Sequence, residues 1–251
     1  MNYALEVQNL SKAYPTFTLR DASFAVPQGA VMGFIGRNGA GKSTTLKALL
    51  GLVHPDGGAV RFFGREFAGN EQNIKEQIGV VLGGIDFYPK KKVKTITAVT
   101  RRFYPRWDEE KYRHYLQLFG IDEEKRVDQL SSGMRVKYLI ALALSHDAKL
   151  LILDEPTSGL DPVSRDDLTE LFAALVADGR RTILFSTHIT SDLEKCATHI
   201  TYIRDGEILC SAEKSAFFAA FDHLRRDGEV LTLEDIMVRT ERRGYDESTL
   251  L

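Results

Sequence analysis

The sequence contains few cysteines and no apolar run long enough to cross a bilayer. Its two cysteines, Cys196 and Cys210, cannot form a disulfide framework and lack the spacing of metal ligands. We expect both to be reduced structural thiols, as in a cytosolic protein. A membrane-spanning helix needs about 18 consecutive apolar residues, and no such run is present. The N-terminus also lacks the charged start and apolar segment of a secretory signal.

An excess of positive charge is absent too. The 33 basic and 35 acidic residues give a formal net charge of −2, so we expect no nucleic-acid partner. Hydrophobic residues make up 43% of the chain, an ordinary value for a globular protein. A chain of 251 residues is long enough for one large α/β domain or for a domain with a subdomain.

Glycines are concentrated between a predicted strand and a predicted helix. An apolar run at Val31–Ile35 precedes the segment Gly36–Ser43, and a helix-forming run at Thr44–Leu50 follows it. Glycines let successive backbone N–H groups point at one anion, and the helix N-terminus adds its positive dipole end. In such a loop Lys42 can reach the β- and γ-phosphates of a nucleotide, and the Ser43 hydroxyl can ligate Mg²⁺. The segment therefore predicts a phosphate-binding loop.

Two adjacent carboxylates follow a second apolar run. Leu150–Leu153 reads as a buried strand that ends in Asp154 and Glu155. Ligands of α/β proteins bind at the carboxyl ends of parallel strands. Because side chains alternate along a strand, we expect one carboxylate to face a phosphate-bound Mg²⁺ and the other to face an attacking water.

Two further segments carry weaker signals. The strand predicted at Arg181–Phe185 stops before His188, which is either a structural histidine or a residue of the ligand edge. Leu130–Gly133 leads into a helix predicted at Arg135–Leu144, and this turn is either an ordinary helix cap or an anion site. Asp161 precedes Pro162 in the pattern of a helix start.

The remaining patterns indicate how the chain is organised. Short strands on either side of Tyr14 indicate a small antiparallel sheet at the N-terminus. Tyr14 itself is either a core aromatic or a platform for a nucleotide base, and its spacing favours the core. We expect a helical insertion between about Gly84 and Met134, with a helix at about Glu109–Phe119 that Asp108 caps.

The order and spacing of these motifs, from about Leu5 to Cys210, resemble the ATP-binding subunit of ABC transporters. The resemblance implies an α/β fold: a P-loop NTPase core with a mostly parallel sheet, an N-terminal antiparallel β-subdomain and a helical signature-motif subdomain. On this basis residues 1–210 form the ATPase domain, with the helical subdomain at about 84–134, and residues 211–251 form a short C-terminal helical extension. The most specific parts are GRNGAGKST at Gly36–Thr44, LSSGM at Leu130–Met134, LLILDEPTSGLDP at Leu150–Pro162 and STH at Ser186–His188.

The resemblance also implies a role for each motif. Glu155 matches the general base and His188 the switch residue at the γ-phosphate, and together with Lys42 they are the implied catalytic residues. Asp161 matches the loop that communicates between paired subunits. Ser131 and Gly133 match the signature positions that contact ATP bound to the other subunit. Tyr14 now matches the residue that stacks on adenine. The ATP phosphate contacts implied by the loop are Gly36, Asn38, Gly39, Ala40, Gly41, Lys42, Ser43 and Thr44, and the Mg²⁺ ligands are Ser43 and Asp154.

Partners follow from the same resemblance. Two ATP-binding chains, identical or closely related, are expected to meet head to tail around two ATP molecules on a separate transmembrane permease. The chain would then lie at the cytoplasmic face of the cell membrane. The segment FYPRWDEEKY at Phe103–Tyr112 resembles bacterial exporters of drugs, lantibiotics or other peptides, and Lys90–Trp107 is the candidate docking surface. The alternative is a soluble ATPase of the same fold that acts on ribosomes or DNA.

The sequence departs from the family pattern at three positions. Ser132 and Met134 stand where the signature commonly has Gly and Gln. Gly83 stands where a Gln usually contacts Mg²⁺ and water and senses the transmembrane partner, and Asp86 is a neighbour that can substitute for it. Gly83 also motivates another hypothesis, a nucleotide-binding regulator with negligible hydrolysis.

Overall fold

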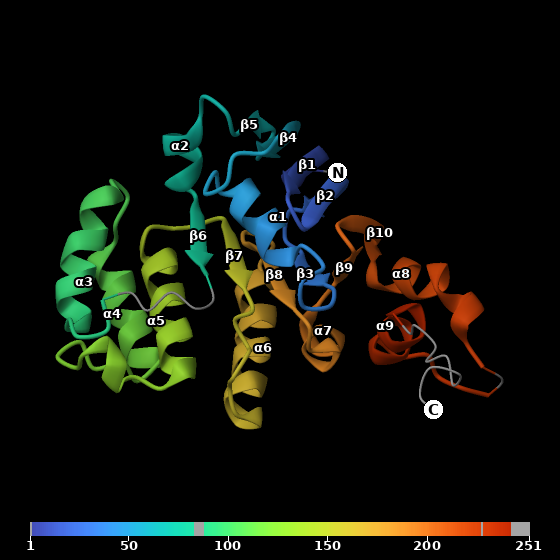
Figure 1. The fold of residues 1–251 in the computed structure, drawn as a ribbon. Helices are drawn as coiled ribbons and strands as arrows, with labels where there is room; N and C mark the ends of the chain where they lie inside the picture. Colours follow the sequence, from blue (N-terminus) through green and yellow to red (C-terminus); the bar gives the residue numbers. More distant parts are fainter. Residues whose placement is uncertain (1, 83–87, 227, 242–251) are drawn as a thin grey trace.

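An antiparallel sheet forms one layer at the N-terminal end of the chain (Figure 1). The computed structural model describes residues 2–82, 88–226 and 228–241. The sheet has the strand order β2-β1-β4-β5, and each of its pairs is antiparallel, as the alternating pattern around Tyr14 predicted. Its strands are β1 (Tyr3–Tyr14), β2 (Phe17–Pro27), β4 (Gly57–Phe62) and β5 (Arg65–Glu66).

A second, mostly parallel sheet forms the centre of the molecule, with the order β10-β9-β3-β8-β7-β6. Only β10 runs antiparallel to its neighbour. The strands β3, β7 and β8 are buried along their whole length, which explains their nearly continuous apolar sequences. The strands are β3 (Val31–Ile35), β6 (Ile78–Val81), β7 (Leu150–Asp154), β8 (Thr182–Thr187), β9 (His199–Arg204) and β10 (Glu207–Glu213).

The two faces of the central sheet belong to two hydrophobic cores. Met32 and Phe34 pack with α1 (Lys42–Leu49) and the antiparallel sheet, whereas Val31 and Ile35 pack on the opposite side. This separation follows from the two-residue period of a strand. The core on this second side is called the main core below. It contains residues of α5 (Ser132–Ser145), α6 (Pro162–Val176), α7 (Thr190–Cys196), α8 (Lys214–Ala220) and α9 (Leu233–Glu241).

A helical unit lies beside the β6 edge of the central sheet (Figure 1). Its own core contains a hydroxyl network, in which the Thr97 hydroxyl lies 2.8 Å from the Tyr112 hydroxyl and 2.9 Å from the Tyr138 hydroxyl. Asp108 caps the second helix of the unit, accepting hydrogen bonds from two backbone N–H groups. The helices are α3 (Val93–Thr100), α4 (Glu109–Leu118) and α5 (Ser132–Ser145), and the short α2 (Glu71–Lys75) precedes β6.

The limits expected for this unit need correction. The end expected at about Met134 falls in the first turn of α5, which continues to Ser145. Ile140 and Leu144 of α5 pack in the main core, whereas Tyr138 and Leu142 pack in the core of the helical unit, so this helix belongs to both. The start expected at Gly84 lies outside the described residues, as do Gly83 and Asp86.

The C-terminal part is likewise more than an extension. The boundary expected after residue 210 falls inside β10. Phe217, Leu233 and Ile236 are completely buried in the main core, so α8 and α9 complete that core at the β10 end of the sheet (Figure 1). An amphipathic pattern shows that one face of a helix is buried, but it does not show which element that face packs against. The sequence periodicity of α8 and α9 therefore did not predict their packing on the sheet.

Two further expectations concern the cysteines and membrane-spanning helices. Cys196 and Cys210 are both free thiols, and burial raises the pKa of Cys196 to about 12, which keeps this thiol protonated and unreactive. Among the described helices, none combines the length and the apolar character that a bilayer crossing requires.

Candidate functional site

The glycine-rich segment forms a tight loop between β3 and α1. Gly39 has φ +84° and Gly41, which precedes the helix, has φ +114°, values that side chains rarely allow. A Cβ at Gly36 would lie 2.4 Å from the Ile203 carbonyl oxygen, so this position also requires glycine. The Gly206 N–H donates to the Ala40 carbonyl at 3.0 Å and ties the loop to the β9–β10 hairpin. The loop thus curls around the N-terminus of α1, where the first helical N–H groups have no partner within the helix.

A cleft of about 650 Å³ lies over this loop. Tyr14 and Phe17 form one wall, and a Cβ at Gly41 would lie only 2.7 Å from the Phe17 ring. Tyr14 is 38% exposed, so the interpretation of this residue as a core aromatic is wrong. The predicted residues that line the cleft are Tyr14, Asn38, Gly39, Gly41, Lys42, Ser43, Thr44, Glu155 and His188.

Three charged or ionisable side chains meet at the floor of the cleft. The Lys42 ammonium donates to the Gly36 carbonyl at 2.7 Å and to the Arg37 carbonyl at 3.2 Å. It also lies 3.2 Å from Glu155 Oε1, and the other oxygen of Glu155 lies 2.8 Å from His188 Nδ1. Lys42 is buried, so these acceptors compensate for the loss of water around its charge. The structure therefore brings together the three residues predicted to be catalytic.

The adjacent carboxylates occupy different environments. Asp154 ends β7 and is buried, and its Oδ1 accepts a 2.6 Å hydrogen bond from the Ser186 hydroxyl on β8. Glu155 has φ +50°, in the left-handed region, so it is not part of the extended strand. The expected alternation along one strand is therefore not what separates the two side chains. The backbone turns at Glu155 instead, and Ser186 fixes this turn by accepting the Glu155 N–H at 2.9 Å.

The donor set for a magnesium ion is small. Ser43 lines the cleft from the first turn of α1. Asp154 is the last residue of β7, a strand that α1 contacts. No group of three or more His, Cys, Asp or Glu side chains with metal-binding geometry occurs among the described residues. Mg²⁺ is commonly held by one or two protein oxygens together with substrate phosphates and water. Hydroxyl and carboxylate oxygens fit that requirement.

Three predicted residues lie outside the cleft, at the N-termini of two other helices. Ser131 caps α5 by accepting the Met134 N–H at 3.2 Å, and Asp161 caps α6 by accepting two N–H groups at 3.0 Å. A Cβ at Gly133 would lie 3.4 Å from Ser164, so the starts of these helices are neighbours. Hydrogen bonds from Ser164 lower the pKa of Asp161, which is therefore a carboxylate at neutral pH. Gly36, Ala40 and Asp154 also do not line the cleft, because they support it from within the fold.

Sequence reasoning assigned no role to several residues of the site. Phe17 lines the cleft from the start of β2, and the pairing of Tyr14 with Phe17 across the first hairpin is the signal that identifies it. The contribution of Ser186 depends on its pairing with Asp154 in the sheet. Arg37 and Ser158 also line the cleft, and although both lie within the quoted motifs, neither was assigned a role.

Comparisons with known proteins agree with this geometry. A family model described as an ABC transporter matches residues 19–158. The chain is 33% identical over 229 residues to the bacitracin transport ATP-binding protein BcrA of Bacillus licheniformis, across 90% of this chain and 72% of that protein. It is 35% identical over 215 residues to the lantibiotic transport ATP-binding protein SrtF of Streptococcus pyogenes, across 83% of this chain and 90% of that protein.

The fold is also similar to solved structures. A structure titled as the ATP-binding subunit of an ABC transporter superposes with a TM-score of 0.82 at 26% identity, covering 95% of this chain and all of the other. Further matches include proteins named for import as well as proteins named for export. The similarity therefore establishes the ATP-binding fold and does not set the direction of transport.

Proposed function

The chain belongs to the ABC transporter family, and from that premise we propose that it is the ATP-hydrolysing subunit of a bacterial peptide or drug exporter. ATP hydrolysis that drives transport is the activity of the family. The observation that carries the ATP-hydrolysing part of this assignment is the contact of Lys42 and His188 with the two oxygens of Glu155, directly beside the glycine-rich loop. Phosphoryl transfer to water requires positioning and electrostatic stabilisation, and this cluster supplies both.

Each residue at the floor of the cleft has a distinct task in the proposed reaction. The loop N–H groups and Lys42 hold the phosphates, and Tyr14 stacks on the adenine. Glu155 accepts a proton from the attacking water, while His188 holds Glu155 by one oxygen and contacts the γ-phosphate. Ser43 and Asp154 would hold Mg²⁺, which neutralises charge on the phosphates when bound.

A second copy or a close paralogue would complete the site. The signature residues Ser131 and Gly133 and the loop residue Asp161 do not line the cleft of their own chain. The N-terminus of α5, with exposed Ser131 and Ser132 at its start, is suited to an anion, because a helix N-terminus carries N–H groups without helical partners and the positive end of the dipole. Head-to-tail pairing would place this helix end over the ATP held by the other chain. The removal of the γ-phosphate would then loosen the pair.

The proposed partner is a separate permease, which places the chain at the cytoplasmic face of the membrane. Phe103, in the candidate docking segment, is 71% exposed, whereas Trp107 is partly buried and packs near Tyr112. The aromatic segment is thus divided between the core of the helical unit and its surface. The transported molecule is proposed to be a peptide antibiotic or a related compound, because the named relatives transport bacitracin and a lantibiotic.

Transport in inside-out membrane vesicles tests the direction and the class of cargo. Vesicles that contain the chain and its permease should take up labelled bacitracin or a lantibiotic when ATP is added outside. Vesicles with Lys42→Ala should not, because the lysine contributes directly to phosphate binding. ATP hydrolysis without uptake of either peptide would refute the proposed cargo, and association of the chain with ribosomes or DNA in place of membranes would favour the alternative ATPase.

Docking is tested separately by surface substitution. Phe103→Asp should reduce co-purification with the permease and leave ATP binding by the isolated chain unchanged, because this residue lies outside the cleft. The matched control is Leu52→Asp, since Leu52 is an exposed apolar residue of similar kind outside the candidate segment. Equal co-purification of both variants with the permease would remove Phe103 from the docking surface.

A further inference from the structure

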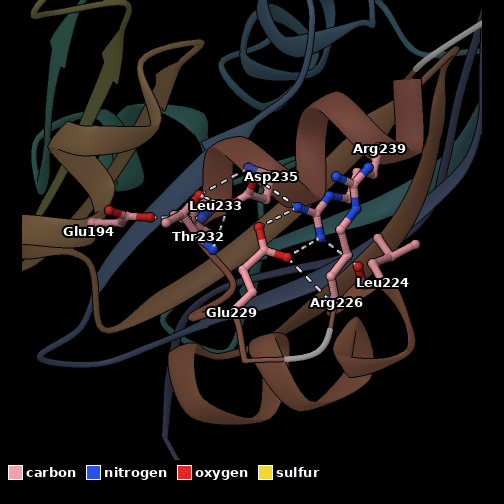
Figure 2. Close-up of polar contacts among 8 residues, drawn as sticks. All are labelled: Glu194, Leu224, Arg226, Glu229, Thr232, Leu233, Asp235 and Arg239. Atoms are coloured by element: carbon pink, nitrogen blue, oxygen red, sulfur yellow. Dashed lines mark hydrogen bonds and ion pairs between the residues drawn. The ribbon is translucent and has the colours of Figure 1, made fainter.

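The C-terminal helix α9 is attached at its beginning to the helix that follows His188. Glu194 on α7 accepts the Leu233 N–H at 2.7 Å, which caps the first turn of α9 (Figure 2). Thr232 and Asp235 complete a capping box, each accepting the backbone N–H of the other at 3.1 Å. This end of α9 is therefore fixed to a structural element that leads directly to the active site.

The connection before α9 is held by one arginine. Arg239, whose side chain is largely buried, donates to the Leu224 carbonyl and to the carboxylates of Glu229 and Asp235 (Figure 2). Below these polar contacts, Leu233 and Ile236 are completely buried in the main core. The helix consequently has a fixed position on the sheet, which defines where its other end lies.

The other end of α9 reaches the phosphate loop. The side chain of Glu241 is only 12% exposed, and one of its oxygens accepts a 2.9 Å hydrogen bond from the Tyr202 hydroxyl on β9. Its second oxygen lies 3.6 Å from the Arg37 guanidinium. Arg204, also on β9, donates to the neighbouring Thr240 carbonyl at 3.1 Å. A buried carboxylate needs such partners, and Arg37 supplies the positive charge.

Arg37 is in turn part of the loop that holds Lys42. Its carbonyl accepts hydrogen bonds from the Lys42 ammonium at 3.2 Å and from the Ala40 N–H at 3.1 Å, and Arg37 is one of the residues that line the cleft. We propose that Glu241 is a positioning residue of the ATP site: held by Tyr202, it fixes Arg37 and thereby the conformation of the phosphate loop. The C-terminal segment thus contributes to ATP affinity. Glu241 makes no described contact with Glu155 or His188, so it acts on binding and not on the chemical step.

This inference concerns ATP binding alone and holds for either direction of transport. The first test compares the steady-state ATPase parameters of the wild-type chain with those of Glu241→Gln. We expect KM for ATP to rise about two- to five-fold, the range that corresponds to losing a partly exposed ion pair, with kcat unchanged. Arg37→Ala should produce a similar change, and adding Glu241→Gln to it should have no further effect.

Glu229→Gln is the matched control. It removes a carboxylate from the same C-terminal segment and weakens the Arg239 contacts without touching the phosphate loop. We expect a lower Tm but no change in KM. Tyr202→Phe is a second variant that leaves the Glu241 charge in place, and it should raise KM less than Glu241→Gln does.

Two results would overturn the proposal: an unchanged KM in Glu241→Gln, or an equal rise in KM in Glu229→Gln. ATP binding by the wild-type chain is measured first, by titrating the chain with ATP. A wild-type chain that does not bind ATP would refute the proposed ATPase function and not this inference.

Discussion

An ion pair joins α6 and α7, the helices that follow β7 and β8. Arg165, in the first turn of α6, donates to Asp192 Oδ1 of α7 at 2.6 Å and to the Ser191 hydroxyl at 3.2 Å. The side chain of Asp192 is 4% exposed and that of Arg165 is 26% exposed. Among the described residues, neither Asp192 Oδ2 nor Arg165 Nε has a hydrogen-bond partner. Each charge therefore depends strongly on the other.

Arg165→Ala should be markedly destabilising for this reason. Removing one partner of a buried pair costs about 3–5 kcal/mol, because the other charge remains buried without compensation. Water reaches part of the Arg165 side chain, so we expect the lower end of this range, about 3 kcal/mol. In a chain of this size that corresponds to a fall in Tm of about 6–12 °C. Urea denaturation followed by circular dichroism at 25 °C measures the free energy of unfolding directly.

A double replacement separates charge from packing. Arg165→Met combined with Asp192→Leu removes both charges together, so its stability should stay within about 1 kcal/mol of the wild type. If Arg165→Ala lowers the free energy of unfolding by less than about 1 kcal/mol, the pair behaves like an exposed surface ion pair. A double variant as unstable as the single one would show that packing, and not uncompensated charge, causes the effect.

Three further predictions concern the active site, pH and the helical unit. Glu155→Gln should lower the rate of phosphate release by about 10²–10⁴-fold and preserve ATP binding, because a general base is lost while the phosphate contacts remain; undiminished turnover would reject this role. Burial lowers the pKa of His146 to about 4, so the unfolded state binds more protons below pH 6.5, and stability should fall as the pH drops from about 6.5 to 4. His146→Gln should flatten this dependence in urea titrations at several pH values. Thr97→Val should destabilise the protein by about 1–3 kcal/mol, since two buried tyrosine hydroxyls lose a partner, and an unchanged urea midpoint would contradict this.

Local patterns were sufficient for much of the fold and for the centre of the site. The glycine-rich loop follows β3, the two carboxylates stand at the end of β7 and the histidine follows β8. Because these strands are parallel, their carboxyl ends meet at one edge of the sheet. Their convergence around Lys42 follows from that rule. The family resemblance identified from these motifs is confirmed by the match to residues 19–158.

Features that depend on the strand order or on distant packing could not be predicted. The hydrogen bond between Ser186 and Asp154 requires that β7 and β8 be neighbours, although they are separated by a long helix. The docking of α9 depends on contacts with Tyr202 and Glu194, which no period in the C-terminal sequence encodes. The departure at Gly83 lies outside the described residues, so the role of this position stays a prediction.

The left-handed conformation of Glu155 places a conflict between stability and activity at a single residue. A long side chain at φ +50° costs about 1–3 kcal/mol of backbone strain, and glycine or asparagine would adopt this conformation more easily. The carboxylate that balances the buried Lys42 charge is thus held at the expense of backbone strain. A glycine or asparagine at this position would remove the strain and the charge balance together, so that relief of the backbone and loss of the general base could not be separated by substitution at Glu155 alone.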